Sequence, residues 1–243
     1  MIVGCFVPDF KYLISALPGN HFGHTWRGAL VLDLPIALAV FWVFEYVVKE
    51  PGIALLPDAL RLRLKRTEHH SIGNPVQFLL VLASILIGIA SHILWDSFTH
   101  GRGWFYRHWP LLNEYIQVTP RHVWPVYKIL QNASTVLGTL LVLAWMVWWY
   151  WTTGSEKDGP ETEDSRKPAA PGWILGVMLM VAMVGGVARG VASSHGSRRG
   201  LVLVAGFTFV LVLWWELVGW GLIFRMRGQR IGRKPRPEHS LGG

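Results

Sequence analysis

The sequence predicts an all-α polytopic membrane protein, a bundle of about five transmembrane helices with a short half-helix at its N-terminus. Apolar residues make up 51% of the 243 residues, whereas charged residues make up only 16%. A soluble domain carries about 25% charged residues, which cover its surface. Several apolar runs reach the ~20 residues with which a helix crosses about 30 Å of hydrocarbon. Low charge and long apolar runs together exclude an ordinary soluble domain.

The first stretch of the chain, residues 1–17, is apolar but is interrupted by Pro8, Asp9 and Lys11. Because proline and charged side chains disfavour a full span, we expect a half-helix there. Five later apolar runs are expected to cross the membrane: Leu30–Val48, Val76–Trp95, Ala133–Trp151, Trp173–Ser193 and Leu201–Phe224.

Composition also divides the chain into regions. Residues 153–172 contain many Glu, Asp, Lys, Pro and Ser and few apolar side chains, which is typical of a flexible linker. This linker separates a membrane region, 1–152, with three spans and most of the histidines, from a two-helix membrane region, 173–224. Residues 225–243 form a basic tail that we expect to be disordered.

Loop charge predicts the orientation in the membrane. Lys and Arg are concentrated in residues 49–75, in the linker and in the tail, which lie on the same side of the expected spans. The positive-inside rule therefore places the linker and the C-terminus in the cytoplasm and the N-terminus outside. The net charge of +8 follows from these segments, so we expect the basic tail to contact anionic lipid of the bilayer and expect no nucleic acid partner.

The densest group of candidate functional residues lies at the end of the second expected span, in the stretch SHILWDSFTH. Within it His92, Asp96 and His100 are spaced by four residues. If the helix continues to His100, the three side chains lie along one face. A His and an Asp at this spacing can bind one metal ion, or can form a pair in which the carboxylate orients the imidazole.

The same row extends backwards through Gly88 and Ser84. Small residues let another helix approach closely, so the polar groups are expected to lie between helices rather than in lipid. Two interpretations stay open from the spacing. In one, His92 and Asp96 only join helices in a scaffold; in the other, they belong to a functional site, which other acids such as Asp9 and Asp33 favour.

Several segments, taken in order, resemble one known family. They are VPDFKY at 7–12, His24-Thr25 with Gly28, LDLP at 32–35, SHILWDSFTH at 91–100 with Gly103-Trp104, and VYKILQNAS at 126–134 with Gly138. In this order they resemble the bacterial membrane proteins grouped as the domain of unknown function DUF4184, over nearly the whole chain. The Ser-His-x-x-x-Asp-x-x-Thr-His stretch is the most specific part of the resemblance.

The resemblance implies a metal site and a location. DUF4184 proteins are similar to inner-membrane hydrolases described as metal-dependent, whose Pro-Asp, His and Ser-His-x-x-x-Asp elements form a metal site. The ligands implied in this chain are Asp9, His24, His92 and Asp96. Such a nitrogen and oxygen set suits Zn²⁺ above other divalent first-row ions, and the implied location is the bacterial cytoplasmic (inner) membrane.

The resemblance also assigns roles around the metal. His92 and Asp96 are the expected catalytic residues, and a further group is expected to surround the ligands: Asp33, Thr99, His100 and Gln131. Two departures from the family pattern stand out. No His motif precedes the Pro-Asp element, and Asn132 occupies a position where His is expected. The expected function is hydrolysis of a lipid or envelope ester or phosphoester at the outer face; the alternative is a non-enzymatic membrane scaffold or assembly factor.

Overall fold

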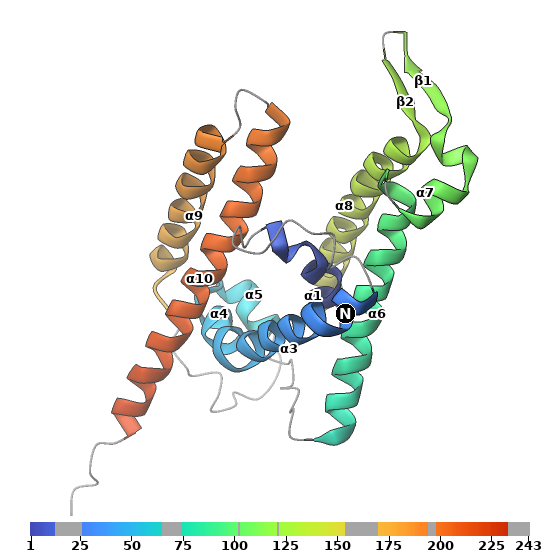
Figure 1. Ribbon diagram of the computed structural model, residues 1–243. Coiled ribbons are helices and arrows are strands. Elements are labelled where there is room, and N and C mark those ends of the chain that lie inside the picture. The colour runs from blue at the N-terminus through green and yellow to red at the C-terminus, as the bar shows by residue number, and fades with distance from the viewer. Residues whose placement is uncertain are drawn as a thin grey trace, which may run out of the picture. The chain divides into compact units, whose positions relative to one another are not determined.

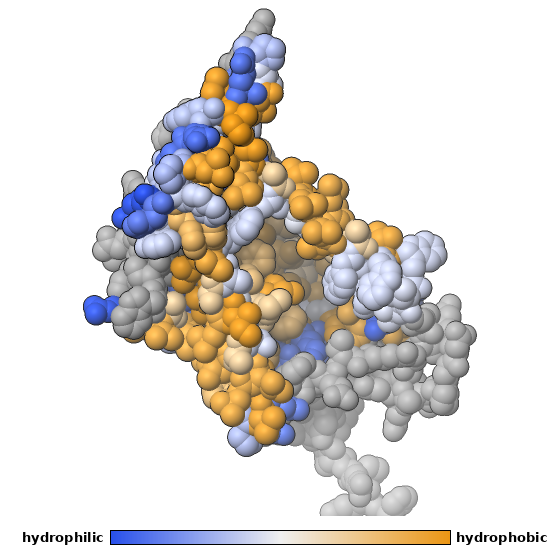
Figure 2. Space-filling view, turned by 90° about the vertical axis from the view of Figure 1, so that its right-hand side faces the viewer, coloured by the Kyte–Doolittle hydropathy of each residue, from blue (hydrophilic) through white to orange (hydrophobic). Residues whose placement is uncertain are grey.

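The structure is a computed structural model that describes residues 1–12, 26–64, 74–101, 103–120, 122–153, 170–193 and 198–232. Among these residues, five helical segments are long and apolar enough to cross a membrane: Ala29–Leu55, Pro75–His108, Val126–Thr152, Gly172–Ser193 and Gly200–Arg227. Each contains or overlaps one expected span, so the prediction of an all-α multi-pass membrane protein is confirmed. Apolar side chains cover much of the helical surface in Figure 2, as a lipid-facing surface requires.

The chain forms two compact units. The first comprises Met1–Phe41 and Glu68–Asp158, and the second comprises Trp42–Thr67 and Gly159–Gly243. Contacts in space define these units, and Trp42–Thr67 lies in the second although it precedes the linker. The division of the chain at the linker stays a prediction, because most of that linker lies outside the described residues.

The first unit carries most of the short elements (Figure 1). Its elements are helix α1 (Ile2–Phe6), the 3-10 helix η1 (Val7–Tyr12), α2 (Trp26–Gly28), the π-helical turn η3 (Ala29–Asp33), the beginning of α3 (Leu34–Val43), α6 (Pro75–Thr99), α7 (Trp104–His108), the 3-10 helix η5 (Pro110–Asn113), strands β1 (Tyr115–Thr119) and β2 (His122–Pro125), and α8 (Val126–Thr152). Helix α1 followed by η1 forms the described part of the N-terminal half-helix segment expected from the sequence, whose residues 13–17 lie outside the described residues.

Helix α6 has defined ends. The Asn74 side chain accepts hydrogen bonds from the backbone N–H groups of Val76 and Gln77, at 2.9 and 3.4 Å. Asn at the N-cap followed by proline is a favourable helix start. At the other end, the backbone N–H of His100 donates to the Asp96 carbonyl at 3.0 Å, so the helical spacing of four holds as far as His100.

The contact between α1 and α6 depends on two glycines. A Cβ atom on Gly4 would lie 2.3 Å from the Ile85 carbonyl oxygen, and one on Gly88 would lie 2.3 Å from the Met1 carbonyl oxygen. Neither position has room for a side chain, so the two backbones touch. Buried apolar residues continue this contact into a core made of Val7, Ala29, Ala37, Val81, Ile85 and Ile89.

A β-hairpin follows α7 and was not expected from the sequence. Strands β1 and β2 pair antiparallel, with Ile116 opposite Trp124 and Gln117 opposite Val123, and a register irregularity lies between Gln117 and Thr119. Both strands are rich in β-branched and aromatic residues, which favour a pleated surface. The hairpin extends beyond the end of α8 (Figure 1).

The second unit contains the end of α3, the π-helical turn η4 (Phe44–Val48), α4 (Lys49–Leu55), α5 (Asp58–Leu64), α9 (Gly172–Ser193) and α10 (Arg198–Gly232). Helix α9 packs on α10 through a row of buried small residues, and a Cβ atom on Gly186 would lie 2.6 Å from the Ala205 carbonyl oxygen. Helix α10 continues past Phe224 to Gly232. The first part of the segment expected to be a disordered tail is therefore helical, because the helix does not stop where the apolar run stops.

Candidate functional site

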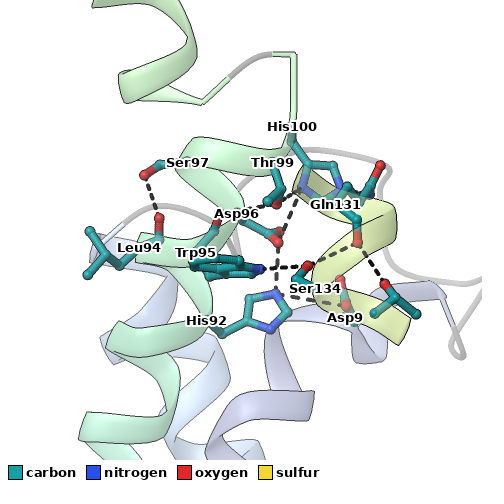
Figure 3. A network of polar contacts seen from close by, with 11 residues as sticks. Asp9, His92, Leu94, Trp95, Asp96, Ser97, Thr99, His100, Gln131 and Ser134 are labelled. Atoms are coloured by element: carbon teal, nitrogen blue, oxygen red, sulfur yellow. Dashed lines mark hydrogen bonds and ion pairs between the residues drawn. The ribbon is translucent and has the colours of Figure 1, made fainter. Parts of the chain in front are cut away.

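Four side chains at the C-terminal end of α6 form what we call the His/Asp cluster: Asp9, His92, Asp96 and His100 (Figure 3). His92 Nε2 lies 3.4 Å from Asp96 Oδ2 and 3.8 Å from Asp9 Oδ2. The other oxygen of Asp96, Oδ1, lies 3.2 Å from His100 Nδ1. One carboxylate thus connects two histidines, and one histidine nitrogen faces two carboxylates.

Local structure explains how these groups meet. The spacing of four along α6 brings three of them onto one face, as the sequence predicts. Asp9 comes from η1, whose position is fixed by the close contact of Gly4 with α6 and by Val7, which is 2% exposed. His92 is also hydrogen-bonded to the backbone of Cys5 in α1. The N-terminal segment therefore supplies one carboxylate and holds the His92 ring.

His100 connects the cluster to α8. Its Nε2 lies 3.2 Å from Gln131 Nε2, and its Nδ1 lies 3.3 Å from the Thr99 hydroxyl. With the amide placed this way, Gln131 donates to an unprotonated Nε2, and the ring proton is on Nδ1. The Thr99 hydroxyl donates to the Trp95 carbonyl at 3.1 Å. The Nδ1–H of His100 then points towards Asp96 Oδ1 and the Thr99 oxygen, both of which accept.

Exposure increases along the cluster. The His92 side chain is 15% exposed and that of Asp96 is 23% exposed, whereas Asp9 and His100 reach 37% and 53%. The cluster therefore has an enclosed end at His92 and an open end at His100.

The remaining predicted residues fall in different places. Asp33 lies in η3 of the same unit and is 2% exposed, and Thr99 is equally buried. His24, the fourth implied ligand, lies outside the described residues. Asn132 donates through Nδ2 to the Lys128 carbonyl on its own helix at 2.9 Å. Gln131, one residue earlier, is the α8 side chain that reaches the cluster.

Sequence reasoning did not find one contact of the site. The indole Nε1 of Trp95 donates to the Ser134 hydroxyl at 3.4 Å, which joins α6 to α8 beside the cluster (Figure 3). Ser134 in turn donates to the Gln131 carbonyl at 2.9 Å. The sequence signal for this contact is a pair of polar residues, Gln131 and Ser134, which lie three apart near the start of an otherwise apolar span.

The donor set can be compared with a metal site. In a tetrahedral site with bonds of about 2.1 Å, neighbouring ligand atoms lie about 3.4 Å apart. The distance from His92 to Asp96 matches that spacing, and the distance from His92 to Asp9 is longer by a few tenths of an ångström. Among the described residues, no group of three or more His, Cys, Asp or Glu side chains is placed so that it could hold a metal ion. Imidazole nitrogen and carboxylate oxygen are donor types that divalent ions such as Zn²⁺ take in proteins.

The fold and the His/Asp cluster define a class: a multi-pass α-helical membrane protein with a polar, acid- and histidine-lined site at one end of a spanning helix. Residues 1–222 match the family described as Domain of unknown function (DUF4184), and the chain belongs to that family. The resemblance seen in the sequence is thereby confirmed. No curated protein and no solved structure matches the chain.

Proposed function

We propose that this protein is a metal-dependent membrane hydrolase whose site is the His/Asp cluster. Asp9, His92 and Asp96 would hold a divalent ion, for which Zn²⁺ suits the donors, and His24 would complete the set. The observation that carries this proposal is that His92 Nε2 faces two carboxylate oxygens, at 3.4 and 3.8 Å. Its hydrogen bond with the Cys5 backbone supports the same role, because ligand histidines are held by a bond at the ring.

The depth of the cluster supports a lipid or envelope substrate. Helix α6 has 25 residues, which at about 1.5 Å per residue exceeds the ~30 Å of hydrocarbon. The cluster occupies its last turns, where the helix leaves the hydrocarbon for the headgroups. Esters and phosphoesters of lipids lie at that level. Loop charge supports an orientation with this end outside the cytoplasm and the C-terminus inside, in what we propose is the cytoplasmic membrane of a bacterium.

The residues of the cluster divide the chemistry between them. A bound divalent ion would supply Lewis acidity to the scissile group and activate water for attack. Asp96 would present Oδ2 to the ion while its Oδ1 accepts from His100, which keeps the carboxylate from turning. A carboxylate or histidine of the cluster would take the proton from the attacking water. Gln131 would hold the His100 ring, and the open end beside His100 would admit the ester.

A scaffold function is the second candidate, and one observation favours it. The row that carries His92 and Asp96 also includes Gly88, which packs directly on the backbone of α1. In a scaffold the whole row would serve packing, and the polar contacts would only fasten η1 and α8 to α6. Neither a metal nor a reaction would then depend on the cluster.

Metal analysis of the purified full-length protein tests the proposal. We expect the wild-type chain to retain a divalent metal, and His92→Ala and Asp96→Ala to lose it. His122→Ala is the matched control, since that histidine lies on the hairpin and contacts Thr119. Equal metal content in all four proteins contradicts the metal site. Loss of thermal stability in the two cluster variants, with no metal in the wild type, supports the scaffold instead.

Hydrolysis is tested separately. Micellar ester and phosphodiester substrates with a chromogenic leaving group report turnover by the metal-loaded protein. We expect activity that a chelator abolishes and that His122→Ala retains. A metal-loaded wild type that cleaves neither substrate class contradicts the hydrolase function while leaving the metal site in place.

A further inference from the structure

A groove lies between the β-hairpin and α8, apart from the His/Asp cluster. Its volume is about 470 Å³, and all but one of its lining residues are apolar: Val118, Trp124, Ile129, Asn132, Ala133, Val136, Leu137 and Leu140. On α8 these positions recur every three or four residues and so form one face. Gln131, at about 100° per residue, lies on the opposite side of the helix. The groove is therefore a different site from the cluster.

The groove is part of an exposed apolar surface on a helix that is long and apolar enough to span a membrane. Val136, Leu137 and Leu140 are 61%, 59% and 58% exposed, and no part of the apolar window of α8 is buried within the protein. A spanning helix with this exposure lies against hydrocarbon chains. The lining of the groove continues that surface upwards onto the hairpin, where Val118 and Trp124 form the other wall. Figure 2 shows apolar side chains on the hairpin as well as on the helices below.

The position and the chemistry of the groove select its occupant. It lies at the N-terminal end of α8, the end where Gln131 contacts His100, and thus near the headgroup boundary. The amide of Asn132 already donates within α8, so the groove presents apolar contacts along its length. Lys128, one turn before Asn132, is a cation at the same end of α8, and cations at the membrane boundary attract lipid phosphates. We propose that the groove binds an acyl chain of a membrane phospholipid, with Trp124 against the chain and its headgroup beyond α8.

Retention of lipid tests this proposal on the full-length protein. Native mass spectrometry after exchange into detergent should show wild-type protein with a bound phospholipid. Ala133→Trp fills the groove and should lose the lipid. Val142→Trp adds the same bulk to another exposed face of α8 and should keep it. A wild type without lipid, or a lipid kept equally by both variants, overturns the proposal. A wild-type dimer without lipid would assign the groove to a second copy of the chain.

Fluorescence provides a measurement that needs no bulky substitution. In vesicles of phosphatidylcholine brominated on the acyl chain, the emission of Trp124 is obtained as the difference between the wild type and Trp124→Phe. We expect this difference to be strongly quenched relative to vesicles of unbrominated phosphatidylcholine. An unquenched Trp124 means that something other than an acyl chain covers it, and contradicts the proposal.

Discussion

The contact of α1 with α6 and the contact of α9 with α10 both depend on glycine, but they bring different groups together. In both, glycines let the two helix backbones approach so closely that no side chain would fit between them. These are Gly4 and Gly88 in the α1–α6 pair and Gly186 and Gly190 in the α9–α10 pair. On α9 the buried row is Met178, Ala182, Gly186 and Gly190, and its last three members are small. On α6 the row continues from Gly88 directly into His92, Asp96 and His100.

The difference shows what close packing does in each unit. In α9 and α10 the small residues maximise van der Waals contact, which is what holds helices together in a medium as apolar as their side chains. In α1 and α6 the same closeness places Asp9 and the backbone of Cys5 beside His92. The α9–α10 contact serves packing alone, whereas the α1–α6 contact also brings together polar groups that would be costly in lipid.

The largest expected effect comes from separating each helix pair. Gly88→Leu and Gly186→Leu both force a side chain into backbone atoms, and overpacking of this kind costs about 1–3 kcal/mol or more. We expect both variants to melt at lower temperature in detergent. Only Gly88→Leu should also remove the metal, because it displaces η1 and Asp9. Gly138→Leu is the control, since a Cβ at Gly138 would meet no atom within 4 Å beyond its chain neighbours and the nearby backbone of its own helix. Full metal content in Gly88→Leu would mean that α1 does not build the site.

A smaller effect is expected from Asp96→Asn, which keeps the packing and removes the charge. The change weakens the contacts of one carboxylate with His92 and His100, and hydrogen bonds to a charged group contribute about 1.5–3 kcal/mol each when enclosed. Because Asp96 is 23% exposed, we expect a total loss near the lower end, about 1–2 kcal/mol. Thermal unfolding measures it.

The matched control for Asp96→Asn is Asp58→Asn in the second unit. Asp58 is paired with Arg61 at 2.7 Å but is 72% exposed, and exposed pairs contribute about 0–1 kcal/mol. If both substitutions have the same effect on stability, the His/Asp cluster is no more than a surface ion pair.

The smallest effect is expected from Gln131→Ala, which removes a side chain from the open end of the cluster. A neutral hydrogen bond contributes about 0.5–1.5 kcal/mol, and water can replace it at a half-exposed ring. We therefore expect little change in melting temperature. The ¹⁵N chemical shifts of the His100 ring should instead change from a single Nδ1–H tautomer to a mixture. Asn132→Ala is the control and should leave the His100 shifts as they are, because that amide bonds to Lys128.

Much of the fold could be predicted from particular residues. The five spans follow from apolar runs of sufficient length, and the row of α6 follows from a spacing of four that the helix preserves as far as His100. The half-helix follows from Pro8 and Asp9 within an apolar stretch. The hairpin could not be found this way, since β1 is only five residues long and exposed on both faces, so its pattern has no period to detect.

For the site, the sequence by itself determined the row on α6, because contacts four residues apart depend only on helix geometry. The resemblance to the family also predicted Asp9 and Gln131 as site residues, but their spacing in the chain gives no physical reason for them to lie near His92 or His100. Only the tertiary structure decided that Asp9 lies 3.8 Å from His92 and that Gln131, not Asn132, reaches His100. Those contacts join residues far apart in the chain, and they depend on which helix faces touch and how closely. For Asp9, the absence of side chains at Gly4 and Gly88 sets that closeness.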